Sequence, residues 1–215
     1  ALLDGIRLEG LSCLPWSKEA VAFRRRVQFL NVQKQKNGGN RIAGILAQVE
    51  LPDLSDDYLL QNLEQWLLPH LTGQNSLKKL QNLNLYNILL VGVSWPQQKL
   101  LDELAPTHMT VPSGSRIAID YSDPDAPTLA VRLQELFGQQ QTPSVINGEY
   151  KLLVHLLSPG YQPMQVTQDL ASFWQTTYFD VKKELRGKYK KHYWPDDPLT
   201  AQATSKTKRF MDLKE

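Results

Sequence analysis

A short segment near the C-terminus combines cationic and aromatic side chains at close spacing. Between residues 182 and 194, Glu184 is the sole acidic residue. The cations are Lys182, Lys183, Arg186, Lys188, Lys190 and Lys191, and the aromatic residues between them are Tyr189, Tyr193 and Trp194. Lysine and arginine neutralise phosphates, and aromatic rings stack on unpaired bases. The segment is therefore a candidate for binding a single-stranded nucleic acid. The alternative, which the sequence leaves open, is a solvated helix end whose rings pack back on the domain.

Residues that could support catalysis or bind a metal are scattered along the chain. The histidines are His70, His108, His155 and His192, and no two of them have the spacing of a metal-binding pair. A zinc site needs converging nitrogen or sulfur ligands, and Cys13 is the sole cysteine. The Pro-Ser-Gly-Ser sequence at 112–115 predicts a turn rather than a nucleophile or a phosphate-binding loop. We expect no catalytic residue and no metal site in this chain.

Charge is distributed unevenly along the chain, whose formal net charge is +2. Residues 106–180 contain 3 basic and 7 acidic residues, whereas residues 181–215 contain 10 basic and 5 acidic residues. An acidic segment is a poor surface for phosphates, so the C-terminal part is the better candidate for nucleic acid. The run Arg24-Arg25-Arg26 lies in a predicted helix, where successive side chains point in different directions. It predicts an ordinary charged surface.

The elements that must position these side chains change in character at Pro106. Residues 1–105 show helical spacing of apolar residues. Ser17 is the expected N-cap of a helix over 18–33, and Ser55 of a helix over 56–68. Pro96 suits the first turn of a helix that ends near Leu104.

Alternation of period two predicts short strands between residues 106 and 168. The predicted strands cover 108–111, 116–121, 128–136, 151–158 and 163–167. Their number and length favour a small five-stranded antiparallel, OB-like barrel. A C-terminal helix with an inward stripe of Tyr178, Val181 and Leu185 follows, and then a basic tail that we expect to be flexible over 199–215. The expected fold class is α+β, with an N-terminal helical segment.

Several long segments resemble one family of helicases. They are GLSCLPW at 10–16, LPDLSDDYLLQNLEQWLLPHL at 51–71, ELAPTHMTVPSGSRIAIDYS at 103–122, LAVRLQELFG at 129–138, LLVHLLSPGYQP at 152–163, QVTQDLASFW at 165–174 and VKKELRGKYKKHYWPDDP at 181–198. This run resembles the C-terminal region of HrpB, a family of bacterial DExH-box ATP-dependent RNA helicases. The resemblance implies a helical accessory segment over 1–105 and an HrpB-type C-terminal domain over 106–198.

The resemblance also implies that the parent protein hydrolyses ATP and acts on RNA. With this resemblance, the cations and aromatic residues of 182–194 are predicted to bind single-stranded RNA. The motor motifs of that family are absent from this sequence: no GxxxxGK[ST] loop occurs, and Asp102-Glu103 is not followed by the residues of a DExH motif. ATP and Mg²⁺ are therefore expected only in motor domains outside this chain, and we expect no cofactor here. We also expect the chain to be a piece of a longer protein.

Composition narrows the protein class further. The chain has 215 residues, of which 41% are hydrophobic and 21% are charged, as is usual for a globular protein. There is no apolar run long enough to span a membrane and no pattern of a secretory signal. A single cysteine fits a reducing compartment, so we expect a cytoplasmic protein, and we expect it to be monomeric.

Two functions from different classes remain open. The first is an accessory region of a helicase that assists RNA binding or regulates the motor without chemistry of its own. The alternative is a protein-interaction module that docks on the helicase core or on another protein without contacting nucleic acid. Salt dependence separates them, because phosphate binding weakens steeply with salt. A free-standing enzyme is disfavoured, since no nucleophile with a matching base is visible.

Overall fold

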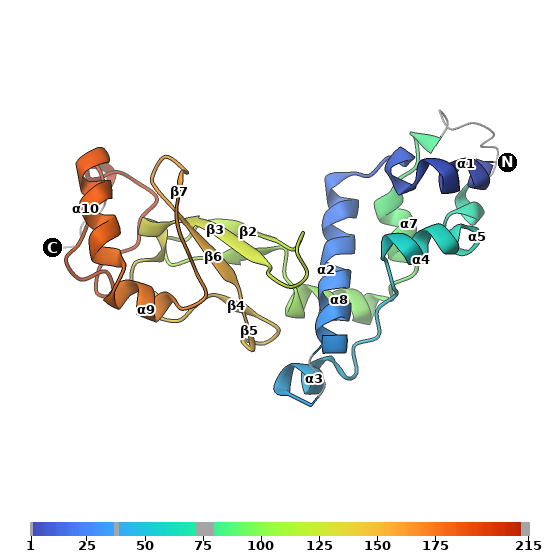
Figure 1. Cartoon of the computed structure of the whole chain (residues 1–215), viewed down its shortest axis with the longest axis horizontal. Helices are drawn as coiled ribbons and strands as arrows, with labels where there is room; N and C mark the ends of the chain where they lie inside the picture. The colour runs from blue at the N-terminus through green and yellow to red at the C-terminus, as the bar shows by residue number, and fades with distance from the viewer. Residues whose placement is uncertain (1, 37–38, 72–79, 212–215) are drawn as a thin grey trace. The chain divides into compact units, whose positions relative to one another are not determined.

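The computed structural model describes residues 2–36, 39–71 and 80–211. The chain divides into two compact units. The first unit comprises Ala1–Ala105 together with Tyr121–Asp125, and the second comprises Pro106–Asp120 together with Ala126–Glu215. The first is helical and the second contains the strands, so the chain is α+β (Figure 1).

Helices form the first unit. They are α1 (Leu2–Glu9), α2 (Lys18–Lys36), α3 (Arg41–Leu46), α4 (Asp56–Gln61), α5 (Leu63–Trp66), α7 (Leu85–Val91) and α8 (Trp95–Leu104), with 3-10 turns η1 (Leu11–Cys13) and η2 (Leu68–His70). The predicted caps are confirmed: Ala20 N–H donates to Ser17 Oγ over 3.1 Å, and Tyr58 N–H donates to Ser55 Oγ over 3.2 Å. The helix expected over 56–68 is wrong, because the chain breaks at Asn62 between α4 and α5.

The three consecutive arginines of α2 have three different environments. Arg24 donates to the Leu54 carbonyl and to Asp56. Arg26 is buried and donates to the Ala105 carbonyl over 2.6 Å, whereas Arg25 is exposed. Because two of the three guanidinium groups hold segments of their own unit together, the run is not a single cationic surface.

The second unit is built on a five-stranded sheet. Its strands are β1 (His108–Thr110), β2 (Arg116–Asp120), β3 (Thr128–Arg132), β6 (Leu153–Leu157) and β7 (Pro163–Thr167), in the order β1-β2-β3-β6-β7. The other elements are the pair β4 (Ser144–Val145) and β5 (Tyr150–Lys151), the helices α9 (Leu170–Gln175) and α10 (Tyr178–Lys188), and the 3-10 turns η3 (Leu133–Leu136) and η4 (Lys208–Phe210).

The expected antiparallel, OB-like barrel is wrong. β3 and β6 pair in parallel, with Thr128 opposite Leu153 and Arg132 opposite Leu157. In the part of the chain that the structure describes, β1 and β7 end the strand order without pairing to each other, so the sheet is mixed and open. The parallel pairing follows from the connection between β3 and β6. β3 ends at Arg132, where η3 begins, and the β4–β5 hairpin comes next. After this hairpin, β6 runs in the same direction as β3.

One face of this sheet packs into the core of the second unit. Leu129 and Val131 of β3 are buried, as are Val154 and Leu156 of β6, while their neighbours along each strand are more exposed. This is the period-two pattern of a strand with one buried face. Among the described helices, none combines the length and apolar character that crossing a bilayer requires.

Candidate nucleic-acid interface

Helix α10 positions the predicted RNA-binding residues. Its stripe of Tyr178, Val181 and Leu185 is buried, as the helical spacing predicted. Tyr178 Oη donates to the Pro195 carbonyl over 2.8 Å, which brings the chain beyond the helix back against it. Burial raises the pKa of Tyr178 far above its ordinary value, so the phenol stays neutral and keeps donating. The helix continues through Gly187 to Lys188.

Two of the nine predicted RNA-binding residues point into the protein. Lys182 is 9% exposed and its Nζ lies 2.5 Å from Asp196 Oδ1. Trp194 is 8% exposed, and its indole N–H donates to the Tyr189 carbonyl over 3.1 Å. The Lys182 ammonium is the largest cause that holds the pKa of Asp196 below its ordinary value. Neither side chain presents a free group to a ligand.

The other two predicted aromatic residues also make contacts within the second unit. Tyr189 Oη lies 3.1 Å from Ser158 Oγ, in the turn between β6 and β7. The ring of Tyr193 packs edge-on against Phe137, with 6.3 Å between ring centroids. Both rings are half-buried. These aromatic residues therefore pack back on the domain, as the alternative interpretation of the sequence expected.

The remaining predicted cations are exposed: Lys183, Arg186, Lys188, Lys190 and Lys191. Lys183 forms an ion pair with Asp180 at 3.5 Å, but both side chains are more than four-fifths exposed. Such a pair is weak and is easily exchanged for another anion. In the described ranges, no carboxylate forms an ion pair with Lys188, Lys190 or Lys191. These charges are available to a ligand.

A second run of cations lies beside this segment. Lys208 N–H donates to the Lys191 carbonyl over 2.9 Å, and Thr204 N–H donates to the Gln134 carbonyl over 3.0 Å. These bonds hold residues 204–208 against the rest of the second unit. Here we give the name C-terminal basic surface to the exposed cations of residues 188–191 and 206–209, which are Lys188, Lys190, Lys191, Lys206, Lys208 and Arg209. Sequence reasoning missed residues 206–209 because their polar composition predicts a frayed end. Their positive charge was the one signal that could have indicated a binding role.

The hydroxyl groups of the turn at 112–115 are directed to a carboxylate of the chain itself. Ser113 Oγ donates to Glu135 Oε1 over 3.0 Å, Ser115 Oγ donates to the same oxygen, and Arg132 Nε donates to Glu135 Oε2 over 2.9 Å. Burial alone would raise the pKa of Glu135, but these hydrogen bonds outweigh burial and hold the pKa below its ordinary value. The predicted turn is thus a structural support for a buried carboxylate.

Over the ranges that the structure describes, His, Cys, Asp and Glu side chains nowhere form a group of three or more that could hold a metal ion. His192 is half-buried, and its Nδ1 lies 3.1 Å from Gln134 Nε2. Burial, and next the charge of Arg132, lower the pKa of His192.

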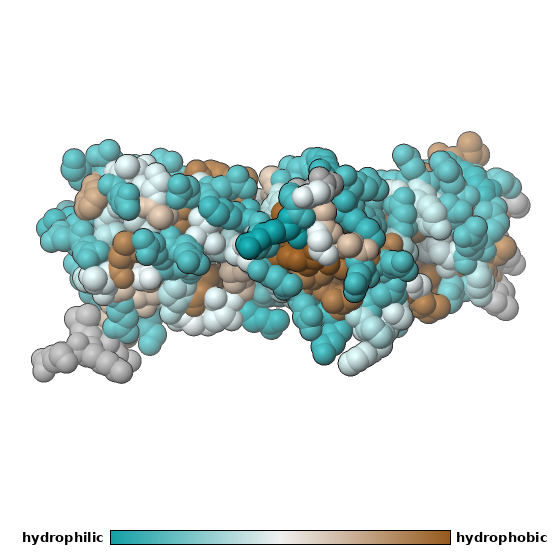
Figure 2. All heavy atoms as spheres, turned by 90° about the horizontal axis from the view of Figure 1, so that it is seen from below, coloured by the Kyte–Doolittle hydropathy of each residue, from teal (hydrophilic) through white to brown (hydrophobic). Residues whose placement is uncertain are grey.

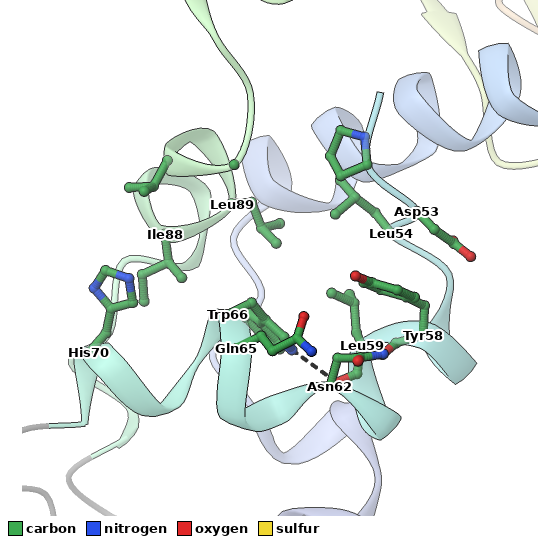
Figure 3. Close-up of a pocket in the computed structure, with 13 residues that line it drawn as sticks. Asp53, Leu54, Tyr58, Leu59, Asn62, Gln65, Trp66, His70, Ile88 and Leu89 are labelled. Carbon is green, nitrogen blue, oxygen red and sulfur yellow. Dashed lines mark hydrogen bonds between the residues drawn. The ribbon is translucent and has the colours of Figure 1, made fainter. Parts of the chain in front are cut away.

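The first unit contains an apolar cleft of about 220 Å³ (Figure 3). Tyr58 and Trp66 form one side of it, and Ile88 and Leu89 of α7 face them. The Trp66 indole N–H donates to the Leu59 carbonyl over 2.9 Å, which fixes the ring as a wall. The cleft has the size and lining to take an apolar side chain, and it is the feature that favours a protein partner. On the face shown in Figure 2, most of the surface is hydrophilic and apolar residues form small separate groups.

Comparisons with known proteins agree on one family. The family described as "HrpB_C: ATP-dependent helicase C-terminal" matches residues 66–198. The ATP-dependent RNA helicase HrpB of Escherichia coli (strain K12) is 43% identical over 210 residues, which cover 98% of this chain and 24% of that protein.

Two solved structures are similar to the chain. A crystal structure of the E. coli DExH-box NTPase HrpB matches 95% of this chain and 24% of its own, with a TM-score of 0.80 and 43% identity. A crystal structure of the Escherichia coli DEAH/RHA helicase HrpB matches 89% of this chain and 23% of its own, with a TM-score of 0.65 and 42% identity. The chain spans about a quarter of the length of these relatives. The predicted resemblance is thereby confirmed, and the chain belongs to the HrpB family, as a C-terminal region of an ATP-dependent helicase.

Proposed function

We propose that this chain is an accessory region of an ATP-dependent RNA helicase, non-catalytic in itself, which holds RNA through the C-terminal basic surface. The observation that carries the proposal is the group of exposed cations on residues 188–191 and 206–209, joined by the hydrogen bond from Lys208 N–H to the Lys191 carbonyl. Support also comes from the relative that is named as an ATP-dependent RNA helicase.

ATP hydrolysis takes place outside this chain. ATP and Mg²⁺ bind motor domains of the parent protein, and this chain works next to that helicase core as a monomeric part of a cytoplasmic enzyme. The acidic residues of the second unit leave its C-terminal surface as the place where phosphates are best accommodated. RNA held there stays near the motor while the motor steps along it.

The test is the binding of fluorescently labelled RNA to the full 215-residue chain. Reversing three charges, with Lys188→Glu, Lys190→Glu and Lys191→Glu, should weaken binding and flatten the salt dependence by about 2 in the log-log slope, at roughly 0.7 per phosphate contact. The matched control reverses three exposed cations of the first unit, Lys18→Glu, Arg25→Glu and Lys99→Glu. Equal losses in both variants, or no loss in the first, would contradict the proposal.

A second candidate function is favoured by the cleft between α4–α5 and α7. Its lining is mostly apolar, and Val91 at its edge is 77% exposed. An apolar side chain of a protein partner, such as the helicase core, would fit there. Such binding changes little with salt, because apolar burial does not depend on counterion release.

A further inference from the structure

We propose that Tyr161 and Phe210 are base-stacking residues of the C-terminal basic surface, and that this surface therefore prefers single-stranded RNA to duplex RNA. The inference rests on the proposed function, since it specifies which form of RNA is held. The stacking residues are then not Tyr189, Tyr193 and Trp194, which the sequence suggested. They are Tyr161, which is 64% exposed, and Phe210, which is 62% exposed.

Tyr161 is presented at the tip of the β6–β7 turn. Its N–H donates to the Ser158 carbonyl over 2.9 Å, and its φ of 62° is unusual for a residue with a side chain. Positive φ at such a residue carries strain, and strain of this kind is often found at functional sites. The Arg132 guanidinium lies over the ring, 5.0 Å from its centroid. Arg132 therefore orients one face of the ring and leaves the ring largely open to a ligand.

The buried end of Tyr189 fixes this turn beside the first run of cations. Tyr189 Oη contacts Ser158 Oγ at 3.1 Å, and a Cβ added to Gly160 would lie 2.8 Å from that same oxygen. The turn and the end of α10 accordingly lie side by side (Figure 1). Tyr189 is thus a positioning residue, because it places Tyr161 next to the segment that carries Lys188 and Lys190.

Phe210 has the same setting at the second run of cations. It ends η4, where its N–H donates to the Thr207 carbonyl over 3.0 Å. The Arg209 guanidinium lies 5.7 Å from the centroid of its ring. Because Lys208 N–H is bonded to the Lys191 carbonyl, η4 is held beside the first run. Each exposed ring therefore has a guanidinium against it. Phe210 also has Lys208 close to it in the chain, whereas Tyr161 is brought to the lysine segment by the contact between Tyr189 and Ser158.

This combination matches a single strand better than other ligands. A strand with unpaired bases offers phosphates to the cations and open ring faces to the aromatic residues, and each base stacked on a protein ring strengthens binding. In a duplex the bases are already stacked on one another, so only the phosphates remain available. A protein partner that covered the rings would have to tolerate the surrounding positive charge, which disfavours an apolar interface.

The experiment compares two RNAs and three variants of the full chain. The probes are a labelled oligouridine of about 12 nucleotides, within the range that single-strand sites cover, and an RNA hairpin of similar charge. Tyr161→Ala and Phe210→Ala should each weaken oligouridine binding about fivefold or more. Both should leave the salt slope and hairpin binding unchanged, because the cations remain. Tyr161→Phe should bind as the unmodified chain does, since the ring is retained.

The controls separate this inference from the function on which it rests. Trp95→Ala removes a ring that is 73% exposed on the first unit and should change nothing. A strand that contains 2-aminopurine reports stacking directly, through a fluorescence change that each alanine variant should reduce. One outcome would contradict the stacking role alone and leave the proposed function standing. In it, the alanine variants bind as the unmodified chain does, while the variant with Lys188, Lys190 and Lys191 changed to Glu binds weakly. If the unmodified chain binds neither RNA at low salt, both are wrong.

Discussion

Lys182 Nζ lies 2.5 Å from Asp196 Oδ1, and this contact joins α10 to the segment that folds back against it. Lys183, the next residue, is exposed and makes only a long contact to Asp180. Two adjacent lysines of one basic run therefore have different roles. The first is part of the packing of the second unit, and the second is a surface charge.

Replacing these two lysines one at a time should change the free energy of unfolding by different amounts. Lys182→Ala removes a buried stem and the partner of Asp196, so the free energy of unfolding in urea should fall. Lys183→Ala should leave that free energy close to its original value, because exposed ion pairs contribute little. A larger loss of stability in Lys183→Ala than in Lys182→Ala would contradict the structural role of Lys182.

The hydroxyl group of Tyr189 approaches Gly160 closely. A Cβ at residue 160 would lie 2.8 Å from Tyr189 Oη, and crowding of this kind costs about 1–3 kcal/mol. In a Tyr189→Phe background the nearest remaining ring atoms are 3.5 and 3.6 Å away, so Gly160→Ala should cost less there. Urea unfolding of the four proteins measures the difference, and equal costs in both backgrounds would rule out the steric cause.

Gly187 provides the matched glycine control. It lies inside α10, and no atom comes within 4 Å of a Cβ added to it. Because alanine is the better helix former by about 1 kcal/mol, Gly187→Ala should raise the free energy of unfolding. A general sensitivity of the second unit to added methyl groups would instead make both glycine variants less stable.

The buried carboxylate of Glu135 should be essential for stability. Glu135→Gln removes the negative charge that faces Arg132, and breaking a buried pair costs about 3 kcal/mol. Since the pKa of Glu135 lies below its ordinary value of 4.5, its contribution is complete above that pH and is lost as the pH falls below it. Thermal unfolding at pH 7 measures the cost. Asp180→Asn, at an exposed pair, is the control and should change little.

His192 should make stability depend on pH between neutral and mildly acidic conditions. Burial and the charge of Arg132 lower its pKa below the ordinary 6.5. The His192 ring therefore binds a proton more tightly in the unfolded chain than in the folded chain. The free energy of unfolding should consequently fall as the pH drops below 6.5. Tyr189 and Trp194 pack around the ring, and Gln134 lies against Nδ1. Titration of the free energy of unfolding with His192→Asn should show a flatter profile, and an identical profile would contradict this assignment.

Local signals predicted much of the helical structure. Ser17 and Ser55 cap their helices through hydrogen bonds within one turn, and such contacts can be inferred from the sequence alone. The stripe of α10 is likewise a local pattern. The strand direction of β6 is not local, because it depends on the connection from Leu133 to Leu152. Alternating apolar residues continue from β3 into η3, so the pattern could not indicate where the strand ends.

The candidate site was predicted in its charge but not in its geometry. Lys188, Lys190 and Lys191 are exposed, as a run of charged residues at a helix end predicts. Trp194 and Lys182 are buried because the Pro195 carbonyl accepts from Tyr178, a tertiary contact that composition cannot show. Phe210 was overlooked since a polar, lysine-rich end predicts fraying. Backbone bonds to Lys191 and Gln134 hold the residues that precede it.

The most direct test of the central claim is fluorescence anisotropy of a labelled single-stranded RNA, titrated with this chain between about 50 and 200 mM salt. If the C-terminal basic surface holds RNA through three or more phosphates, log affinity should fall with log salt with a slope of about −2 or steeper. Binding whose affinity is unaffected by salt, or no binding at the lowest salt, would contradict the account and would favour the apolar cleft of the first unit as the functional surface.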